Sequence, residues 1–218
     1  MKKYLIIIIL FYHSEISTLS FAEEINLPQL IQNQYQTILS FKGSFEQTSF
    51  RISSQSLARK AEGEVFYKRP GKMKWLYKKP EEQLLVTNGI TVWLYDTVLE
   101  NVTIQKLEKL TDGTVLSFLL GIGDLNKDFK RRKISKSLLE NPVGLILELK
   151  PKKEAANLAF IQLEVSSESY NLLRVAIMDQ EGNYRIIALH SMKYNLDLED
   201  NFFEFEVSSD MEVIKTEN

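Results

Sequence analysis

The chain has 218 residues, a formal net charge of −2 and a hydrophobic fraction of 44%, which suit one domain or two small domains with a real core. It contains no cysteine, so disulfides, thiol catalysis, zinc sites with cysteine ligands and an acylated N-terminal cysteine are excluded. An acidic chain of this kind is also a poor match for nucleic acid, and no such partner is expected.

The first residues predict an export signal. Two lysines precede an apolar run over residues 4–12, and Ser20 and Ala22 place small side chains at positions −3 and −1 of a cleavage site. The apolar run is too short to be a transmembrane helix. We therefore expect residues 1–22 to be a cleaved secretory signal peptide, and residues 23–218 to form a single domain in the periplasm.

The next segment predicts a helix and then a strand. Over residues 27–40 the apolar side chains recur at spacings of three and four, Asn26 suits the N-cap, and Pro28 falls in the first turn. Residues 41–48 then alternate between two kinds of side chain, which is typical of a strand, with Phe45 on the apolar face.

Residues 68–96 carry most of the largest side chains of the chain. Pro-Gly at 70–71 and Asn-Gly at 88–89 are strong turn signals, so the segment predicts an antiparallel meander. Strand alternation places on one face Met73, Trp75 and Tyr77. The opposite face is rich in lysine. An aromatic face that lacks catalytic residues suggests a surface for an apolar ligand.

Short strands continue along most of the remaining chain. We expect them at residues 61–68, 72–79, 82–88, 90–96, 98–106, 130–136, 143–150, 158–166, 171–178, 184–194 and 202–207. One or two short apolar helices interrupt them within residues 111–126. The economical fold is α+β and mainly antiparallel β: an unclosed, strongly curved half-barrel with two or three short helices against one face.

The helices predicted at 27–40 and 111–126 would cover the aromatic concave face of this sheet. Loose packing between them and the sheet would leave a hydrophobic cavity, as in barrels that hold one small ligand. Because a strand has a period of two, we expect the cavity to be lined by Phe45, Met73, Trp75, Tyr77, Leu84 and Val86.

Patterns for catalysis, cofactors or metals are weak. His190 is the only histidine that follows the export signal, and a lone strand histidine is more often structural than catalytic. Residues 121–123 read Gly-Ile-Gly without the third glycine of a dinucleotide motif. We expect no enzyme, metal or cofactor. The basic run at 130–133 is either a solvated strand start or a contact for an acidic partner or anionic head groups.

The ordered set of motifs resembles the outer-membrane lipoprotein carrier family, LolA. The resemblance covers about residues 27–207 and is carried, after the amphipathic helix, by Ser40–Gln47, Gly63–Gly71, Trp75–Tyr77, Pro80, Leu84–Gly89 and Trp93–Asp96. It implies an unclosed barrel with a helical lid over a hydrophobic cavity. It also implies a monomeric carrier that takes acylated lipoproteins from an ATP-driven release transporter in the inner membrane and passes them to an outer-membrane receptor.

The resemblance further implies roles for two residues, and it leaves alternative functions open. Arg69 aligns with an arginine that closes the lid by hydrogen-bonding to it, and Trp75 aligns with a cavity-lining aromatic. The alternative is a periplasmic lipid-binding or envelope-stress-sensing protein with the same half-barrel, although such regulators usually carry a second domain. The receptor itself would need an acylated cysteine, and a periplasmic hydrolase would need a clustered polar site.

Overall fold

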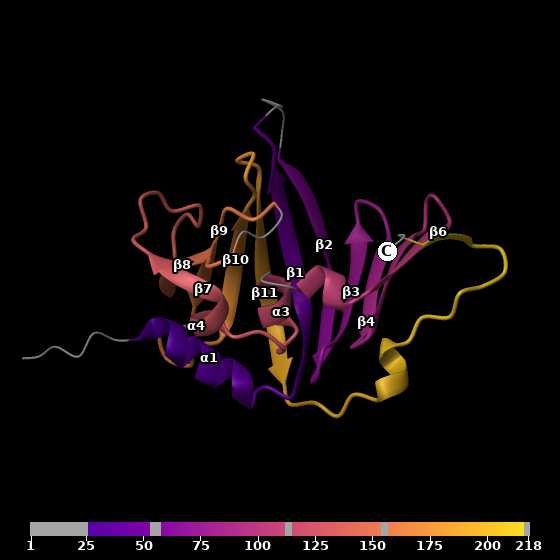
Figure 1. Ribbon diagram of the computed structural model, residues 1–218, viewed down its shortest axis with the longest axis horizontal. Helices are drawn as coiled ribbons and strands as arrows, with labels where there is room; N and C mark the ends of the chain where they lie inside the picture. The colour runs from indigo at the N-terminus through magenta and orange to yellow at the C-terminus, as the bar shows by residue number, and fades with distance from the viewer. Residues whose placement is uncertain (1–25, 53–57, 112–114, 154–156, 216–218) are drawn as a thin grey trace, which may run out of the picture.

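The computed structural model describes residues 26–52, 58–111, 115–153 and 157–215. The predicted export signal lies outside these ranges. Twelve strands of the described residues form one curved sheet in the order β12-β6-β5-β4-β3-β2-β1-β11-β10-β9-β8-β7 (Figure 1). Their bounds are β1 Ser40–Phe50, β2 Arg59–Lys68, β3 Lys72–Lys79, β4 Gln83–Asn88, β5 Thr91–Asp96, β6 Asn101–Lys106, β7 Phe129–Arg132, β8 Leu145–Pro151, β9 Phe160–Val165, β10 Leu172–Met178, β11 Tyr184–Tyr194 and β12 Glu212–Lys215.

Neighbouring strands are antiparallel except for the pair β12 and β6, which is parallel. The order begins at β12 and ends at β7, so the described sheet does not close on itself. This confirms the predicted α+β fold with an unclosed, mainly antiparallel sheet. The short helices are α1 Leu27–Thr37, α2 Glu108–Thr111, α3 Val115–Leu119 and α4 Leu125–Asp128, with a 3-10 turn, η1, at Asp200–Phe203.

Helix α1 lies below the concave face, beside α4 (Figure 1). The side chain of Asn26 caps it by accepting a hydrogen bond from the backbone N–H of Gln29. The helix is shorter than the predicted range 27–40, because Ile38 is already extended and Ser40 pairs with β2. Early entry into the sheet therefore sets the end of α1.

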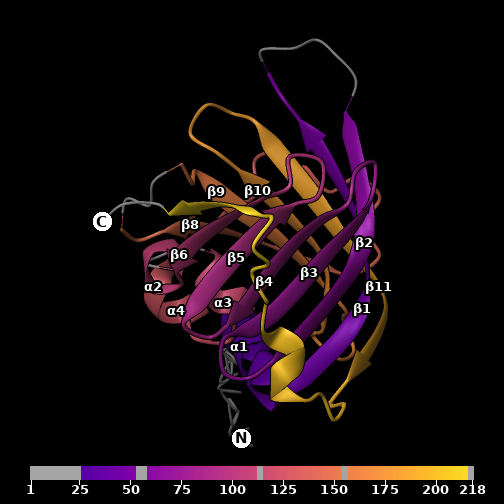
Figure 2. The ribbon, with the colours of Figure 1, turned by 90° about the vertical axis from the view of Figure 1, so that its right-hand side faces the viewer.

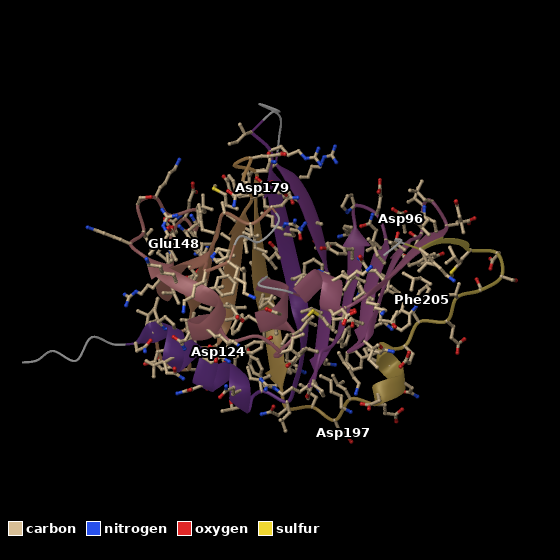
Figure 3. All side chains as sticks on the ribbon, viewed as in Figure 1. Asp96, Asp124, Glu148, Asp179, Asp197 and Phe205 are labelled. Carbon is tan, nitrogen blue, oxygen red and sulfur yellow. The ribbon has the colours of Figure 1, made fainter. Side chains whose placement is uncertain are left out.

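The apolar segment predicted as one or two helices contains parts of three. Helix α3 ends before Gly121, which has a φ of +67° and favours a residue without a Cβ. Helix α4 begins after Asp124, whose side chain accepts hydrogen bonds from two backbone N–H groups of the first turn (labelled in Figure 3). We use the name lid for α1, α3 and the loop of residues 120–123.

The C-terminal part of the chain runs outside the sheet. The strand predicted at 202–207 is wrong: η1 and the following residues cross the convex face of β3–β6 before β12 joins the sheet beside β6 (Figure 2). Phe203 is fully buried there, and the rings of Phe205 and Tyr95 lie 5.5 Å apart (Phe205 is labelled in Figure 3). A small second apolar layer thus covers the back of the sheet.

The main core lies between the concave face and the helices. Residues from α1, α3, β1, β2, β3 and the strands β8–β11 contribute to one cluster of buried apolar side chains. Among the described residues, no helix is long and apolar enough to span a membrane.

Candidate functional site

A small apolar cavity lies between the concave face and the lid. Its volume is about 30 Å³, and its lining is Tyr35, Ile38, Phe41, Val65, Met73, Trp75, Leu119, Leu172, Val175, Ile187, Leu189, Met192 and Tyr194. This volume is far below the roughly 300–1,000 Å³ of pockets that hold an organic ligand. The structure is therefore a closed form, in which an acyl chain has no room until the lid moves away from the sheet.

Four of the predicted cavity residues share the concave face. Met73 and Trp75 line the cavity. Phe45 is 1% exposed and packs against Trp75, with ring centroids 4.6 Å apart, and Tyr77 packs against Phe45 at 5.0 Å. In this closed form, Phe45 and Tyr77 therefore pack beside Trp75 and do not line the cavity.

Trp75 has an unusual polar group. Its indole N–H is buried, and among the described residues no acceptor meets it with hydrogen-bond geometry. The hydroxyl of the neighbouring Tyr77 donates to Gln47 at 3.2 Å. Burial raises the pKa of Tyr77, while the positive charge of Arg185 and the nearby indole of Trp75 oppose that rise. The indole N–H thus lies close enough to the Tyr77 hydroxyl to lower its pKa, but it makes no hydrogen bond of good geometry in this form.

The prediction that Leu84 and Val86 face the cavity is wrong. In the pairing of β3 with β4, Leu84 lies opposite Leu76, and Val86 lies opposite Lys74. Directly paired residues of antiparallel strands share a face, so both side chains point to the convex side. Val86 is fully buried but lies outside the main core cluster, because η1 covers β4 on that side.

Arg69 joins the sheet to the end of α1. Its Nε donates to the carbonyl of Ile38 at 3.2 Å, and its Nη2 donates to the carbonyl of Tyr35 at 3.0 Å. Its own backbone N–H donates to the carbonyl of Leu39 at 2.8 Å. A guanidinium at the C-terminal end of a helix also meets the negative end of the helix dipole. The side chain predicted to hold the lid thus bonds to it in the closed form.

Two tyrosines, which the sequence analysis did not single out, extend this contact to α3. The hydroxyl of Tyr35 donates to the carbonyl of Leu119, and that of Tyr67 donates to the carbonyl of Leu120 at 3.4 Å. Burial raises the pKa of both phenols, and the positive charge of Arg69 opposes the rise. A useful signal was present: on a buried face, tyrosine rather than phenylalanine indicates a hydroxyl with a partner.

The loop after α3 approaches these groups very closely. A Cβ on Gly121 would lie 2.1 Å from the hydroxyl of Tyr67 and 3.3 Å from Nη2 of Arg69. The backbone N–H of Gly71, in the turn after Arg69, donates to the carbonyl of Leu120 at 3.2 Å. Sheet, α1 and α3 therefore meet at one hydrogen-bonded junction beside the cavity.

Other candidate sites lie outside this junction. His190 is exposed, with its Nε2 3.9 Å from a carboxylate oxygen of Glu46. The basic run at 130–133 is exposed on and directly after β7, an edge strand of the described sheet, where charged side chains hinder pairing with other chains. Within the described ranges, no group of three or more His, Cys, Asp or Glu could hold a metal ion.

Known proteins are similar to this chain in sequence. A family model described as outer membrane lipoprotein carrier protein LolA matches residues 36–206. An outer-membrane lipoprotein carrier protein of Legionella pneumophila (strain Corby) is 29% identical over 215 residues, which cover 98% of each chain. A protein of the same name from Azotobacter vinelandii is 33% identical over 196 residues, 89% of this chain and 90% of that protein.

A solved structure shows a similar fold. The crystal structure of an uncharacterized conserved protein from Thermus thermophilus matches with a TM-score of 0.53 and 14% sequence identity, over 86% of this chain and 98% of that chain. At this identity the likeness concerns the fold alone.

Proposed function

The chain belongs to the outer membrane lipoprotein carrier family, LolA, and on that premise we propose how it carries its cargo. It binds the acyl chains of lipoproteins released from the inner membrane, keeps them from water in the periplasm, and delivers them to an outer-membrane receptor. Its partners are the acylated lipoprotein, an ATP-driven release transporter and the receptor. It acts as a monomer and catalyses no reaction.

The observation that carries the proposal is an apolar cavity closed by hydrogen bonds that its own ligand must break. Burying one methylene group stabilises a complex by about 0.8 kcal/mol, so a long acyl chain supplies a large driving force. Each charge-assisted bond from Arg69 to the lid opposes opening by about 1.5–3 kcal/mol. The net binding free energy is what acyl burial supplies minus what it costs to break these bonds. It is smaller than the binding free energy of an open pocket, which suits a carrier that must release its cargo.

The buried N–H of Trp75, which makes no hydrogen bond of good geometry in the closed form, offers a polar contact at this cavity. Acyl chains reach a lipoprotein through ester and amide carbonyls, and such a carbonyl would accept the buried indole donor. A hydrogen bond of this kind contributes about 0.5–1.5 kcal/mol. It would fix how far the chains slide along the concave face.

The proposal is tested with the mature protein purified from the periplasm. Mass spectrometry of the bound material should find acylated lipoproteins. In vitro, Trp75→Asp should abolish binding of a fluorescent fatty-acyl probe, because it places an unpaired charge in the apolar cavity. Leu84→Asp is the matched control: on the convex side it should leave probe binding close to wild type.

Two outcomes would contradict the carrier function. Undiminished probe binding by Trp75→Asp would mean that the concave face does not receive acyl chains. Co-purification of free phospholipid without any acylated polypeptide would favour a lipid-handling or stress-sensing protein built on the same half-barrel.

A further inference from the structure

Two arginines stand in one row across the sheet, far from the lid. In the pairing of β1 with β2, Ser49 lies opposite Arg59, and in the pairing of β1 with β11, Ser49 lies opposite Arg185. Directly paired residues share a face, and neighbouring strands lie about 4.8 Å apart. The two arginines therefore flank Ser49 on the concave face, with their Cα atoms roughly 10 Å apart.

These arginines border a wide open groove. Its volume is about 600 Å³, and its lining is Gln47, Ser49, Arg51, Arg59, Lys60, Ala61, Tyr77, Lys79, Pro80, Glu81, Gln83, Leu85, Leu94 and Arg185. The turn after β10, marked by Asp179, and the β1–β2 hairpin lie at one end of the molecule, and Asp197 marks the opposite end near α1 (Figure 3). The groove thus opens at the end of the concave face that α1 does not cover.

The positive charges in this groove are poorly matched. Lys79 pairs with Glu62 at 2.6 Å. Among the described residues, Arg51, Arg59 and Arg185 form no ion pair, and residues 53–57 contain no acidic side chain. One carboxylate, from Glu81, also lines the groove.

The adjoining turn does not supply the missing anions. Asp179 and Glu181, which follow β10, accept hydrogen bonds from the side chain of Asn183. They share a second hollow with Arg51 and Arg185, but among the described residues no ion pair joins them. Arginine side chains that face a groove without carboxylate partners are suited to bind an external anion bidentately.

The groove continues the acyl cavity along the same strands. On β11, Leu189 and Ile187 line the cavity and Arg185, two residues before Ile187, lines the groove. On β3, Trp75 lines the cavity and Tyr77 lines the groove. A molecule with an apolar end in the cavity would therefore bring its next polar portion to the arginines.

Resting on the proposed function, we propose that the basic groove binds acidic side chains of the cargo polypeptide just after its acylated end. The carrier then recognises lipoproteins through two covalently linked parts: acyl chains beneath the lid and a short acidic segment along the row Arg59–Ser49–Arg185. Cargo with a neutral or basic segment there would bind more weakly.

The spacing of the charges favours a peptide over a lipid head group. An extended peptide rises about 3.3 Å per residue and alternates its side chains between two faces, so two carboxylates two residues apart point to the same side about 6.6 Å apart. Two long arginine side chains whose Cα atoms lie roughly 10 Å apart can converge on such a pair. A phospholipid such as phosphatidylglycerol carries one phosphate, which would engage one end of the row. A groove of about 600 Å³ also leaves room for several residues.

The test uses the mature full chain and synthetic diacylated lipopeptides that differ only after the acylated cysteine. One carries two aspartates two residues apart, the second carries asparagines at the same positions, and the third carries lysines there. At low salt, the wild type should bind the aspartate peptide about three to ten times more tightly than the asparagine peptide, as for two exposed ion pairs. The difference should vanish near 1 M salt.

The double variant Arg59→Gln with Arg185→Gln should bind the aspartate and asparagine peptides equally. The double variant Arg59→Glu with Arg185→Glu should prefer the lysine peptide. A matched control, Lys130→Gln with Lys133→Gln, removes two exposed positive charges from the region of β7 and should keep the wild-type preference. All variants should bind a plain fatty-acyl probe as the wild type does, which keeps this test separate from the carrier function.

Equal affinity of the wild type for the aspartate and asparagine peptides would overturn the inference while leaving acyl binding intact. A second outcome would assign the row to a lipid head group instead. In it, the wild type does not discriminate among the peptides but binds phosphatidylglycerol vesicles, and the double glutamine variant loses this vesicle binding. Failure of every acylated probe to bind the wild type would contradict the proposed function itself.

Discussion

Arg69 reaches two carbonyls of one helix end with two nitrogens of one planar group. A guanidinium holds its donors in a fixed fork, whereas a lysine ammonium is a flexible point charge. The bonds exist only while α1 lies against the sheet. Arg69 is therefore suited to bias the empty protein toward closure without blocking the cavity.

Replacing this arginine should separate loading from release. Arg69→Leu should bind the fatty-acyl probe as well as the wild type or more tightly, because the lid opens at a lower cost. It should pass lipoprotein poorly to the receptor, so that loaded carrier accumulates in the periplasm. Arg69→Lys should lie between the two. Transfer by Arg69→Leu at the wild-type rate, measured with purified receptor, would refute the role of Arg69 in release.

The hydroxyl of Tyr35 should contribute to stability in a way that depends on pH. Tyr35→Phe leaves the carbonyl of Leu119 without this donor and should lower the free energy of unfolding by about 1–2 kcal/mol. Tyr95→Phe, on the convex side, should change it by less than about 0.5 kcal/mol. Both are measured by denaturant unfolding at pH 7.

The pH dependence follows from burial, which raises the pKa of Tyr35 well above its ordinary value. The folded phenol then keeps its proton where the unfolded one loses it. Its contribution is full below about pH 10 and falls as the pH rises further. The wild type should therefore lose stability above pH 10 more steeply than Tyr35→Phe, and parallel curves would assign the alkaline loss to other groups.

Single-residue orientation was predictable only within one strand at a time. Alternation correctly grouped Met73 with Trp75, because both belong to β3. Whether Leu84 joins them depends on the register of β4, which places it opposite Leu76. A shift of one residue exchanges the two faces of a strand. In β4 that choice was ambiguous, since Leu84 and Leu85 are both apolar.

At the scale of elements, the C-terminal segment shows why period-two alternation does not prove a strand. Phe203 and Phe205 alternate with two glutamates. The alternation arises because Phe203, the last residue of η1, and Phe205, in the extended chain after it, both face the convex side of the sheet. Lys68 and Lys72 anchor its start by pairing with Asp200 at 2.7 and 2.9 Å. The side-chain pattern is that of a strand, yet this segment has no ladder of its own.

This segment should stabilise the sheet through Phe203. Phe203→Ala removes a ring that is fully buried and should lower the free energy of unfolding by about 3–5 kcal/mol. Phe202 is 36% exposed, so Phe202→Ala should cost markedly less. Thermal and denaturant unfolding of the two variants provide the comparison. Equal, small effects would mean that the segment is only loosely attached to the convex face.

Over the whole molecule, local sequence signals predicted the hairpins but not the overall strand order. Turn motifs define β2–β3 and β4–β5, which are neighbours along the chain. The pairings of β1 with β11 and of β12 with β6 join distant segments, and no local pattern encodes them. The contacts of the lid were also not predictable from local sequence. Arg69 was found by family resemblance, but its acceptors on α1 are backbone carbonyls, which every residue possesses.

The closed cavity leads to a last prediction about the whole molecule. With room for about 30 Å³, acyl chains can enter only if the lid leaves the sheet. The amide of Gly71 donates to the carbonyl of Leu120 in the lid and should lose this bond on loading.

Binding a ligand stabilises the folded state as a whole and slows exchange that requires global unfolding. The Gly71 amide should nevertheless exchange faster in the loaded protein, while the amide of Phe45, within β1 between two paired strands, should exchange more slowly. Hydrogen exchange followed by NMR, with and without a saturating acyl ligand, measures both. Slower exchange at both positions would mean that the chains enter without opening the lid.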